Sequence, residues 1–451
     1  MTASKKVHLL VLIHGMWGNP THLTEMFRIY NETIGPAADE SRSGPDGEEL
    51  HVIVPETNKD SATYDGIDWG GERVTEEIYE EVKKLAAEGK TVTRFSITGY
   101  SLGGLIGRYV VGILMQKDFF ESVTPVNFST VATPHLGQVL TKTFLSKTFA
   151  FFGPKLLSRT GKQLYAQDKW AGSGKPLLDN LADSGLVFYK ALSSFQRVRF
   201  YANAINDVTV PYLTAAAATS DPFPGYSYSG LKIEINGKYA PIIESFTPPE
   251  TPKPKPPGPR PFTKPWFRSL EPRLPPILQF KYPANLVIYV LLPVLVPVFF
   301  SMIMVRLSLE KRDSIARLKV LESDESYRER LVHVVGQLEK TIEDAAIDIM
   351  ESPEPQSGSG SSQTLLHVGP ASSSPPPEGS SKPTAPSPFL SPRQLQIAET
   401  LSRLPNLKKE LAFIDQILNS HAVIVARDVQ RFEHHRRGQG VLQHLADNFV
   451  M

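Results

Sequence analysis

The first roughly 200 residues alternate between short apolar runs and longer stretches in which apolar positions recur every three or four residues. The short runs are rich in β-branched and aromatic residues, which is typical of buried strands. They cover Val7–Ile13, His51–Val54, Thr93–Thr98, Phe128–Ala132 and Arg197–Asn203. Strands that alternate with helices predict an α/β fold with a mostly parallel sheet and helices on both faces.

The clearest helical stretch runs from Glu72 to Glu88, with Ile78, Val82 and Leu85 on one face and Gly89 as its predicted end. From Gly137 to Asp168 the pattern changes to an aromatic-rich, helix-prone insertion. We predict that it forms a cap over the active site, within a segment that spans about residues 137–195. The alternative is a peripheral helix of the core.

The second half of the chain predicts several further segments. A Pro-rich basic stretch can only be extended or irregular, and a Ser/Pro/Gly-rich tract has too little apolar surface to fold. The predicted division is an α/β core at 1–247, a Pro-rich linker at 248–285, a hydrophobic segment at 286–305, a charged helical segment at 306–350, a disordered linker at 351–392, and a C-terminal segment at 393–451 that folds with the core.

Composition narrows the function classes. The hydrophobic share of 41% and the charged share of 21% are those of a folded protein. A net charge of +1 gives no indication of nucleic-acid binding. The chain has no cysteine, which removes disulfides and thiolate chemistry and fits a reducing compartment. The apolar run Val7–Ile13 is too short for a signal peptide, so we expect synthesis in the cytosol.

The segment Gly99-Tyr100-Ser101-Leu102-Gly103 matches the Gly-x-Ser-x-Gly nucleophile elbow. Such a pentapeptide arises by chance about 0.15 times in a chain of this length, so the motif alone is weak. Its context strengthens it, because a strand precedes it and a helix-prone run from Leu102 to Met115 follows. A sharp turn between the two strains the serine and leaves room only for glycine beside it. Ser101 is the predicted nucleophile.

A second loop follows the first long strand and reads His14-Gly15-Met16-Trp17-Gly18. A His-Gly loop at this place brings a backbone N–H towards the nucleophile, where it stabilises the oxyanion of the tetrahedral intermediate. We assign the two oxyanion N–H groups to Met16 and Leu102. We expect His14 itself to be structural.

A serine nucleophile needs a base, and the base needs an acid to hold its tautomer. In this fold class the acid follows the serine and precedes the histidine. Asp207 comes just after the strand Arg197–Asn203 and is the best acid, whereas Asp179, Asp183 and Asp221 are less well placed. The alternative for Asp207 is a surface turn.

No histidine lies between Asp207 and the hydrophobic segment, so the base must come from later in the chain, where the candidates are His333, His367, His421, His434, His435 and His444. His421 has a polar turn before it and an apolar run after it, and is the predicted base. A structural histidine is the alternative. His135 follows a strand but precedes Asp207, which breaks the usual order, so we expect it to lie in the pocket wall or behind it.

At these residues the chain resembles the fungal family of "putative serine esterases", which includes Rog-type lipases and the lipid droplet phospholipase of yeast. The matching stretches are His14–Asn19, Gly99–Gly104, Ala132–Gly137, Asn206–Pro211 and Asn419–Ala422. The resemblance implies an α/β-hydrolase fold, hydrolysis of glycerophospholipids or acylglycerols, no cofactor and no metal. It places the catalytic serine, aspartate and histidine at Ser101, Asp207 and His421.

The hydrophobic segment Leu286–Val305 has twenty uncharged residues and is long enough to cross a bilayer as a helix. Pro293 and Pro297 lie in its middle, and each removes a backbone hydrogen bond that lipid cannot replace. These prolines also argue against a buried core helix. If the segment spanned the membrane, Ser101 and His421 would lie on opposite sides.

Either His421 is not the base, or the segment enters and leaves the lipid by the same face. Both flanks are basic, which favours the second option. We therefore expect a hydrophobic hairpin that anchors the enzyme to lipid droplets or to the cytosolic face of the endoplasmic reticulum. Two other functions stay open: a non-catalytic lipid-surface tether that retains the fold, and a thioesterase or protein deacylase.

Overall fold

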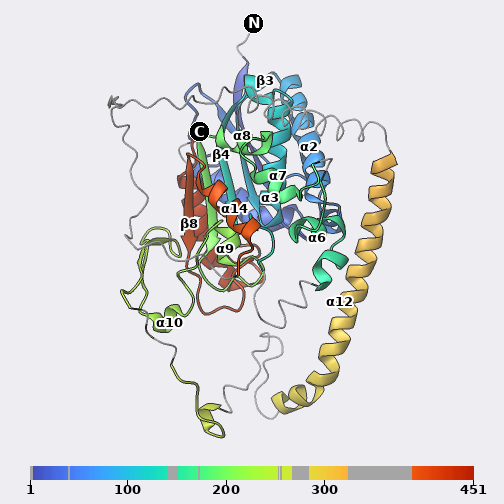
Figure 1. Ribbon diagram of the computed structural model, residues 1–451. Coiled ribbons are helices and arrows are strands. Elements are labelled where there is room, and N and C mark those ends of the chain that lie inside the picture. Colours follow the sequence, from blue (N-terminus) through green and yellow to red (C-terminus); the bar gives the residue numbers. More distant parts are fainter. Residues whose placement is uncertain are drawn as a thin grey trace, which may run out of the picture.

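The computed structural model describes residues 4–38, 41–139, 151–170, 173–251, 253, 256–266, 284–323 and 389–451 (Figure 1). Among these residues, six strands form one parallel sheet in the order β2-β1-β3-β4-β5-β8. The strands are β1 (Lys5–Ile13), β2 (Glu49–Ile53), β3 (Lys90–Tyr100), β4 (Thr124–Val131), β5 (Arg197–Asn203) and β8 (Leu407–Ala412). The five strands predicted from sequence are confirmed, with small shifts at their ends.

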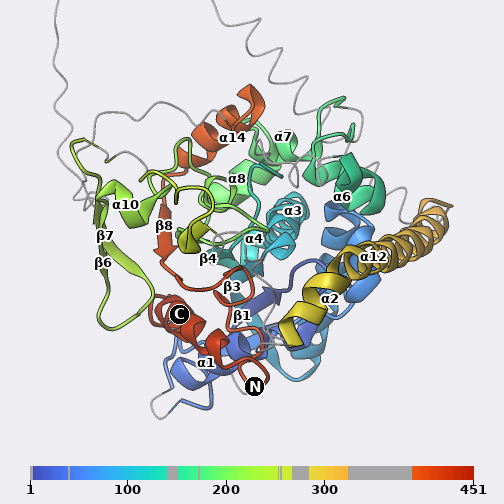
Figure 2. The ribbon, with the colours of Figure 1, turned by 90° about the horizontal axis from the view of Figure 1, so that it is seen from below.

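The central strands are apolar on both faces, because helices cover both sides of the sheet. On β1, Leu9 and Val11 enter one apolar cluster, and Leu10 and Leu12 enter the other. One layer contains α2 (Ile67–Ala87), α3 (Leu102–Gln116) and α8 (Val187–Ser193), and the opposite layer contains α1 (Thr24–Thr33) and α15 (Gln439–Asp447). Figure 2 shows the two layers on either side of the strands.

The helix predicted from Glu72 begins at Ile67. The prediction missed its first residues because polar and glycine positions there interrupt the apolar pattern. It ends where predicted, since Gly89 follows with a positive φ of 75°. The shorter elements are η1 (Pro20–Leu23), η2 (Asp60–Tyr64), α4 (Phe119–Ser122), α9 (Tyr212–Ala215), α10 (Tyr226–Ser229), η4 (Glu433–Gly438) and the antiparallel pair β6 (Lys232–Ile235) and β7 (Ile243–Thr247).

The C-terminal segment is part of the hydrolase body. Strand β8 pairs in parallel with β5, and α14 (Pro392–Ser402) packs Ile397 and Leu401 into the main core. Helix α14 begins with a capping box, in which Ser391 and Gln394 satisfy each other's backbone N–H groups. The chain therefore returns to the sheet after more than 150 residues, and brings the C-terminal loops to the edge where β3 ends.

The insertion predicted as a cap is described except for residues 140–150 and 171–172. It contains α6 (Ser158–Leu164) and α7 (Leu177–Ala182). Asp68, at the start of α2, is buried and holds the insertion by accepting hydrogen bonds from Arg159, Gln163 and Trp170. The described part thus packs beside α2. Coverage of the active site stays a prediction.

The hydrophobic segment belongs to one long helix, α12 (Ala284–Ser323). In contrast to the predicted hairpin, the chain makes no turn at Pro293 and Pro297, which lie inside this helix. Their spacing of four residues places them on one side of the helix, so the backbone bonds on its other sides continue. No part of its most apolar stretch is buried in the protein. The predicted linkers at 324–350 and 351–388 lie outside the described residues.

Candidate active site

Ser101 stands at a sharp turn between the end of β3 and the start of α3. Its backbone has φ 55° and ψ −124°, a strained conformation for a residue with a side chain. The Ser101 N–H donates to the carbonyl of Val131 at 2.8 Å, which fixes the turn to the neighbouring strand. The serine therefore lies at the carboxyl edge of the sheet and at the N-terminus of a fifteen-residue helix.

The glycines of the elbow are required by space. A Cβ at Gly99 would collide with the backbone of Gly103 and Gly104, and a Cβ at Gly103 would collide with the carbonyl of Ile13. The expectation that only glycine fits beside the serine is confirmed. A parallel sheet of this strand order with a strained serine after β3 is the arrangement of an α/β-hydrolase.

The His-Gly loop lies against the elbow. A Cβ on Gly15 would stand 2.7 Å from the Cβ of Ser101, so the two backbones approach closely. The N–H groups of Met16 and Leu102 have no backbone acceptor among the described residues, and Leu102 is the first residue of α3. Both donors are thus available beside the nucleophile, although their role in an oxyanion hole stays a prediction.

His14 is buried and its Nδ1–H donates to the carbonyl of Gly15 at 3.0 Å. Burial lowers its pKa, so the ring is neutral at physiological pH. This bond shapes the loop that carries Met16, which fits the structural role expected of His14.

The structure brings together the three residues predicted as a triad. The Nε2 atom of His421 lies 2.9 Å from Ser101 Oγ, and its Nδ1 atom lies 3.0 Å from Asp207 Oδ2. All three side chains are largely buried, with Ser101 and His421 each 8% exposed. This is the distance and order that a serine–histidine–aspartate relay needs, because the base touches the nucleophile and the acid touches the far nitrogen of the base.

Asp207 is held by four hydrogen bonds. Its Oδ1 atom accepts from the backbone N–H groups of Thr209 (3.1 Å) and Val210 (2.8 Å), and Oδ2 accepts from Asn203 Nδ2 at 2.9 Å and faces His421. The carboxylate is therefore fixed by its own turn, and its Oδ2 atom can receive only the Nδ1–H tautomer of His421.

The loop that carries His421 is attached to the loop that carries Asp207. Asn419 contacts Thr209, and Ser420 Oγ donates to the carbonyl of Ile205 at 3.0 Å. Tyr100 OH, one residue before the nucleophile, donates to the carbonyl of His421 at 3.0 Å. Sequence patterns gave no indication of these positioning contacts, which join residues more than 200 positions apart.

Comparison with known proteins agrees with this geometry. Residues 3–221 match the family model described as "Putative serine esterase (DUF676)". These 219 residues, just under half of the chain, are therefore similar to that esterase family. The "Putative lipase ROG1" of Saccharomyces cerevisiae is 30% identical over 250 residues, which is 55% of this chain and 34% of that protein. The "Putative lipase C4A8.10" of Schizosaccharomyces pombe is 29% identical over 222 residues, which is 48% of this chain and 27% of that protein.

The chain thus spans about a third of the length of these curated relatives. Among solved structures, the product of gene lin2722 from Listeria innocua aligns with a TM-score of 0.28 and 16% identity, over 47% of this chain and 78% of that one. This TM-score is too low to support the fold, so the fold assignment rests on strand order and the elbow. The esterase family match itself ends before His421, which the tertiary structure supplies.

The other candidate residues lie away from Ser101. His135 is fully buried, stacks on Phe200 with ring centroids 3.8 Å apart, and contacts Thr130 through Nε2. It is a core residue, which agrees with the expected place behind the pocket wall rather than in it. Burial holds its pKa well below the usual value. His435 and His444 bond to Asp428 and Tyr201 respectively, away from Ser101.

Three large apolar side chains are exposed next to the catalytic loops. Trp17 (47% exposed) belongs to the His-Gly loop, Val208 (67%) follows Asp207, and Leu418 (55%) comes just before Asn419. We call these three residues the apolar rim. Each of the three therefore lies on a loop that carries a residue of the candidate site or its near neighbour.

A cavity of about 490 Å³ lies between η1, the start of α1 and residues 426–432. Its charged and titratable lining residues are His22, Glu25, Arg427, Asp428 and Arg431. Glu25 is engaged by Arg28, and the Asp428 side chain accepts from the backbone N–H of Arg431. Arg427 has no carboxylate within ion-pair distance among the described residues, and its guanidinium bonds to Tyr100.

The Arg427 cavity thus combines two arginines, Arg427 and Arg431, with two carboxylates, Glu25 and Asp428, next to the residue that precedes the nucleophile. Burial and the charge of Arg427 lower the pKa of His22, which keeps this ring a neutral donor or acceptor. Nothing in the sequence marked Arg427, since a lone arginine after an apolar run is common. In the part of the chain that the structure describes, no group of three or more histidine, aspartate or glutamate side chains is arranged to hold a metal ion.

Proposed function

We propose that this chain is a serine hydrolase that cleaves the acyl esters of membrane lipids through an acyl-enzyme on Ser101. The observation that carries the proposal is the unbroken series of contacts from Ser101 through His421 to Asp207, at 2.9 and 3.0 Å. The match of residues 3–221 to a serine esterase family model supports the same reaction class.

The reaction follows from the positions of these groups. His421 Nε2 removes the Ser101 proton while Oγ attacks the ester carbonyl, and the N–H groups of Met16 and Leu102 stabilise the resulting oxyanion. His421 then returns the proton to the leaving alcohol, which leaves an acyl-enzyme. Water, deprotonated by His421, attacks the acyl carbonyl, and the fatty acid departs as the proton returns to Ser101.

Two features support a lipid as the substrate. The loops of the candidate site carry the three exposed side chains of the apolar rim, Trp17, Val208 and Leu418. The yeast relatives are named putative lipases. Between glycerophospholipids and acylglycerols, the Arg427 cavity favours the phospholipids, because the Arg427 guanidinium has no carboxylate within ion-pair distance among the described residues and can bind a phosphate, which an acylglycerol lacks.

Helix α12 supports action at a membrane or droplet surface. Its uncharged stretch of twenty residues corresponds to about 30 Å of helix, close to the thickness of the hydrocarbon core. Because Ser101 and His421 meet in one body, the segments before and after α12 lie on the same side of the lipid. Since α12 is one unbroken helix, this topology requires its apolar half to lie in the lipid without crossing it, which agrees with a cytosolic enzyme on lipid droplets or the endoplasmic reticulum.

The test compares the purified wild type with Ser101→Ala, and uses Ser184→Ala, an exposed serine, as the matched control. Labelling by a fluorophosphonate probe and fatty-acid release from phosphatidylcholine vesicles and triacylglycerol emulsions are measured. We expect Ser101→Ala to lose labelling and at least about a thousandfold of the release, and the control to behave as wild type.

The outcomes separate the rivals. A non-catalytic tether predicts that the wild type is not labelled at all. A thioesterase or protein deacylase predicts labelling, together with cleavage of acyl thioesters and no fatty acid from lipids. Release from vesicles that survives in pure Ser101→Ala would contradict the proposed nucleophile.

A further inference from the structure

The polar half of α12 is fixed to the body through Asp65, a carboxylate with no exposed side-chain surface. Arg317 of α12 contacts it through Nη2 at 3.0 Å and Nε at 3.1 Å, and Arg73 of α2 contacts it from the other side at 2.9 Å. Arg317 also donates to the side chain and the carbonyl of Ser61. We call these four residues, Ser61, Asp65, Arg73 and Arg317, the Asp65 clamp.

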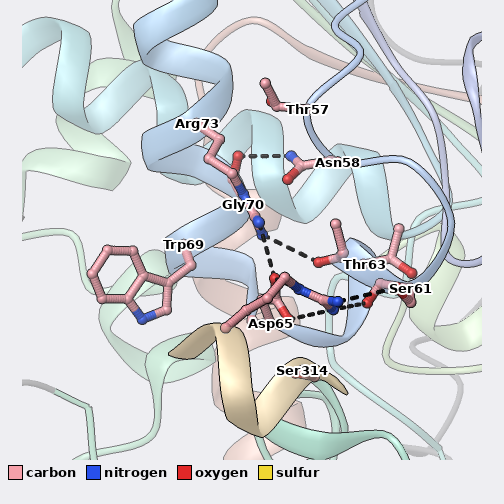
Figure 3. Close-up of polar contacts among 12 residues, drawn as sticks. Thr57, Asn58, Ser61, Thr63, Asp65, Trp69, Gly70, Arg73 and Ser314 are labelled. Carbon is pink, nitrogen blue, oxygen red and sulfur yellow. Dashed lines mark hydrogen bonds and ion pairs between the residues drawn. The ribbon is translucent and has the colours of Figure 1, made fainter. Parts of the chain in front are cut away.

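A second contact lies one helical turn away. Ser314 Oγ donates to Ser158 Oγ of α6 at 3.0 Å, and both side chains are buried. Leu318, on the next turn, is only 8% exposed. Figure 3 shows Ser61 and Asp65 between α2, which carries Arg73, and the turn of α12 that carries Ser314. The two parallel hydrogen bonds from Arg317 to a buried carboxylate fix the orientation of α12 relative to the body as well as its distance from it.

The clamp is connected to the His-Gly loop through Trp17. The loop that contains Ser61 and Asp65 also receives Trp17, whose backbone N–H donates to Thr63 Oγ1 at 3.2 Å and whose Nε1 donates to Tyr64 OH at 2.6 Å. Trp17 is a member of the apolar rim. The same short segment therefore contacts the long helix on one side and the rim on the other.

The two halves of α12 differ sharply in their surroundings. The half that carries Ser314 and Arg317 is attached to the body, whereas residues 290–305 are exposed and uncharged. In Figure 1 the apolar half continues past the carboxyl edge of the sheet, in the direction in which strand β8 points. Ser101 and the apolar rim belong to that same edge.

From this arrangement we infer that the Asp65 clamp orients the enzyme on the membrane. The apolar half of α12 inserts into lipid, and the clamp holds the body so that the apolar rim and Ser101 face the bilayer surface. Arg317 is then a positioning residue for hydrolysis at an interface. The inference rests on the proposed function for its substrate, and its experiment includes a readout that does not depend on activity.

The experiment compares Arg317→Gln with Arg312→Gln in the full chain. Both variants remove one positive charge from α12, so their electrostatic attraction to lipid is matched, but Arg312 is exposed and has no contact among the described residues. Three quantities are measured: flotation with phosphatidylcholine–phosphatidylserine vesicles, hydrolysis of a soluble p-nitrophenyl ester, and fatty-acid release from the same vesicles.

We expect Arg317→Gln to float with vesicles and to cleave the soluble ester within about twofold of wild type, while fatty-acid release from vesicles falls about tenfold. Arg312→Gln is expected to match wild type in all three measurements. Vesicle hydrolysis that is unchanged in Arg317→Gln would overturn the inference. A parallel loss of soluble-ester hydrolysis would also overturn it, because Arg317 would then act on the active site itself.

Rescue provides the second test. The chain has no cysteine, so the pair Ser158→Cys and Ser314→Cys can form a single disulfide in place of the 3.0 Å hydroxyl contact. In the Arg317→Gln background we expect the oxidised pair to restore vesicle hydrolysis and the reduced pair not to. Failure of the closed disulfide to restore it would count against orientation as the cause.

A fluorescence measurement reports the orientation of the enzyme on the vesicle and does not require enzymatic activity. Val208 is exposed on the apolar rim, and Val208→Cys would carry an environment-sensitive fluorophore as the only cysteine of the chain. With Arg317 intact we expect its emission to shift to the blue on vesicle binding, and in Arg317→Gln to lose most of that shift. Equal shifts in both would refute the clamp even if the protein proved to have no esterase activity.

Discussion

Asp207→Asn offers a sharp test of the triad, because the surroundings of this side chain decide how an amide would sit. Two backbone N–H groups, of Thr209 and Val210, point at Oδ1, so the oxygen of the asparagine must stay there. The NH2 group then replaces Oδ2 and faces His421 Nδ1. His421 must respond by making Nδ1 an acceptor and carrying its proton on Nε2.

In that tautomer Nε2 already holds a proton and cannot take the one on Ser101. The loss expected for a wrong tautomer is about 10⁴-fold in kcat, equivalent to about 5 kcal/mol of transition-state stabilisation. The fold can accommodate the amide. Asn203 has an Oδ1 atom that is buried without a partner, and a flip of its amide would let this atom accept from the new NH2 group.

The assay is kcat with a soluble p-nitrophenyl ester, together with thermal unfolding. The control is Asp415→Asn, which removes a carboxylate that pairs with Arg437 in the same C-terminal region. We expect the control to keep kcat within about twofold, and Asp207→Asn to unfold close to the wild-type temperature while losing activity. If Asp207→Asn kept more than about a tenth of the wild-type kcat, Asp207 would not be the group that sets the tautomer.

Three further predictions concern other parts of the molecule. Gly15→Ala places a Cβ 2.7 Å from the Cβ of Ser101, so the loop must move, and we expect kcat to fall at least about tenfold with little change in the melting temperature. Arg427→Met is expected to lower kcat/KM for phosphatidylcholine about tenfold and to leave that for diacylglycerol within about twofold; equal losses would argue against a phosphate site in the cavity. Burial raises the pKa of the Asp221 carboxyl from 3.8 to about 6, so ionisation weakens the folded state as the pH rises through this range. Asp221→Asn should therefore raise the melting temperature by about 2–4 °C near pH 7.5 and have little effect near pH 4, whereas Asp183→Asn, in a similar but more exposed turn, should have little effect at either pH.

The sheet and the nucleophile elbow were predictable from the pattern of residues along the chain. Strands with continuous apolar runs can only be buried on both faces, which requires helices on either side, and the glycines around Ser101 leave few other conformations for that turn. The order serine, acid, histidine along the chain also reduced the candidates for the catalytic acid to Asp207 and for the base to His421. Local pattern suffices for these features because each depends on neighbouring residues.

The contacts between distant segments are visible only in the folded molecule. The contacts of His421 with Ser101 and Asp207 span 320 and 214 positions, and no periodicity in the sequence predicts them. Sequence placed a break at the prolines of α12, but the helix continues, because two missing backbone bonds on one side do not end a helix of this length. The attachment of Arg317 to Asp65 depends on a buried carboxylate between two helices, and burial is a property of the packed molecule that the chain alone does not display.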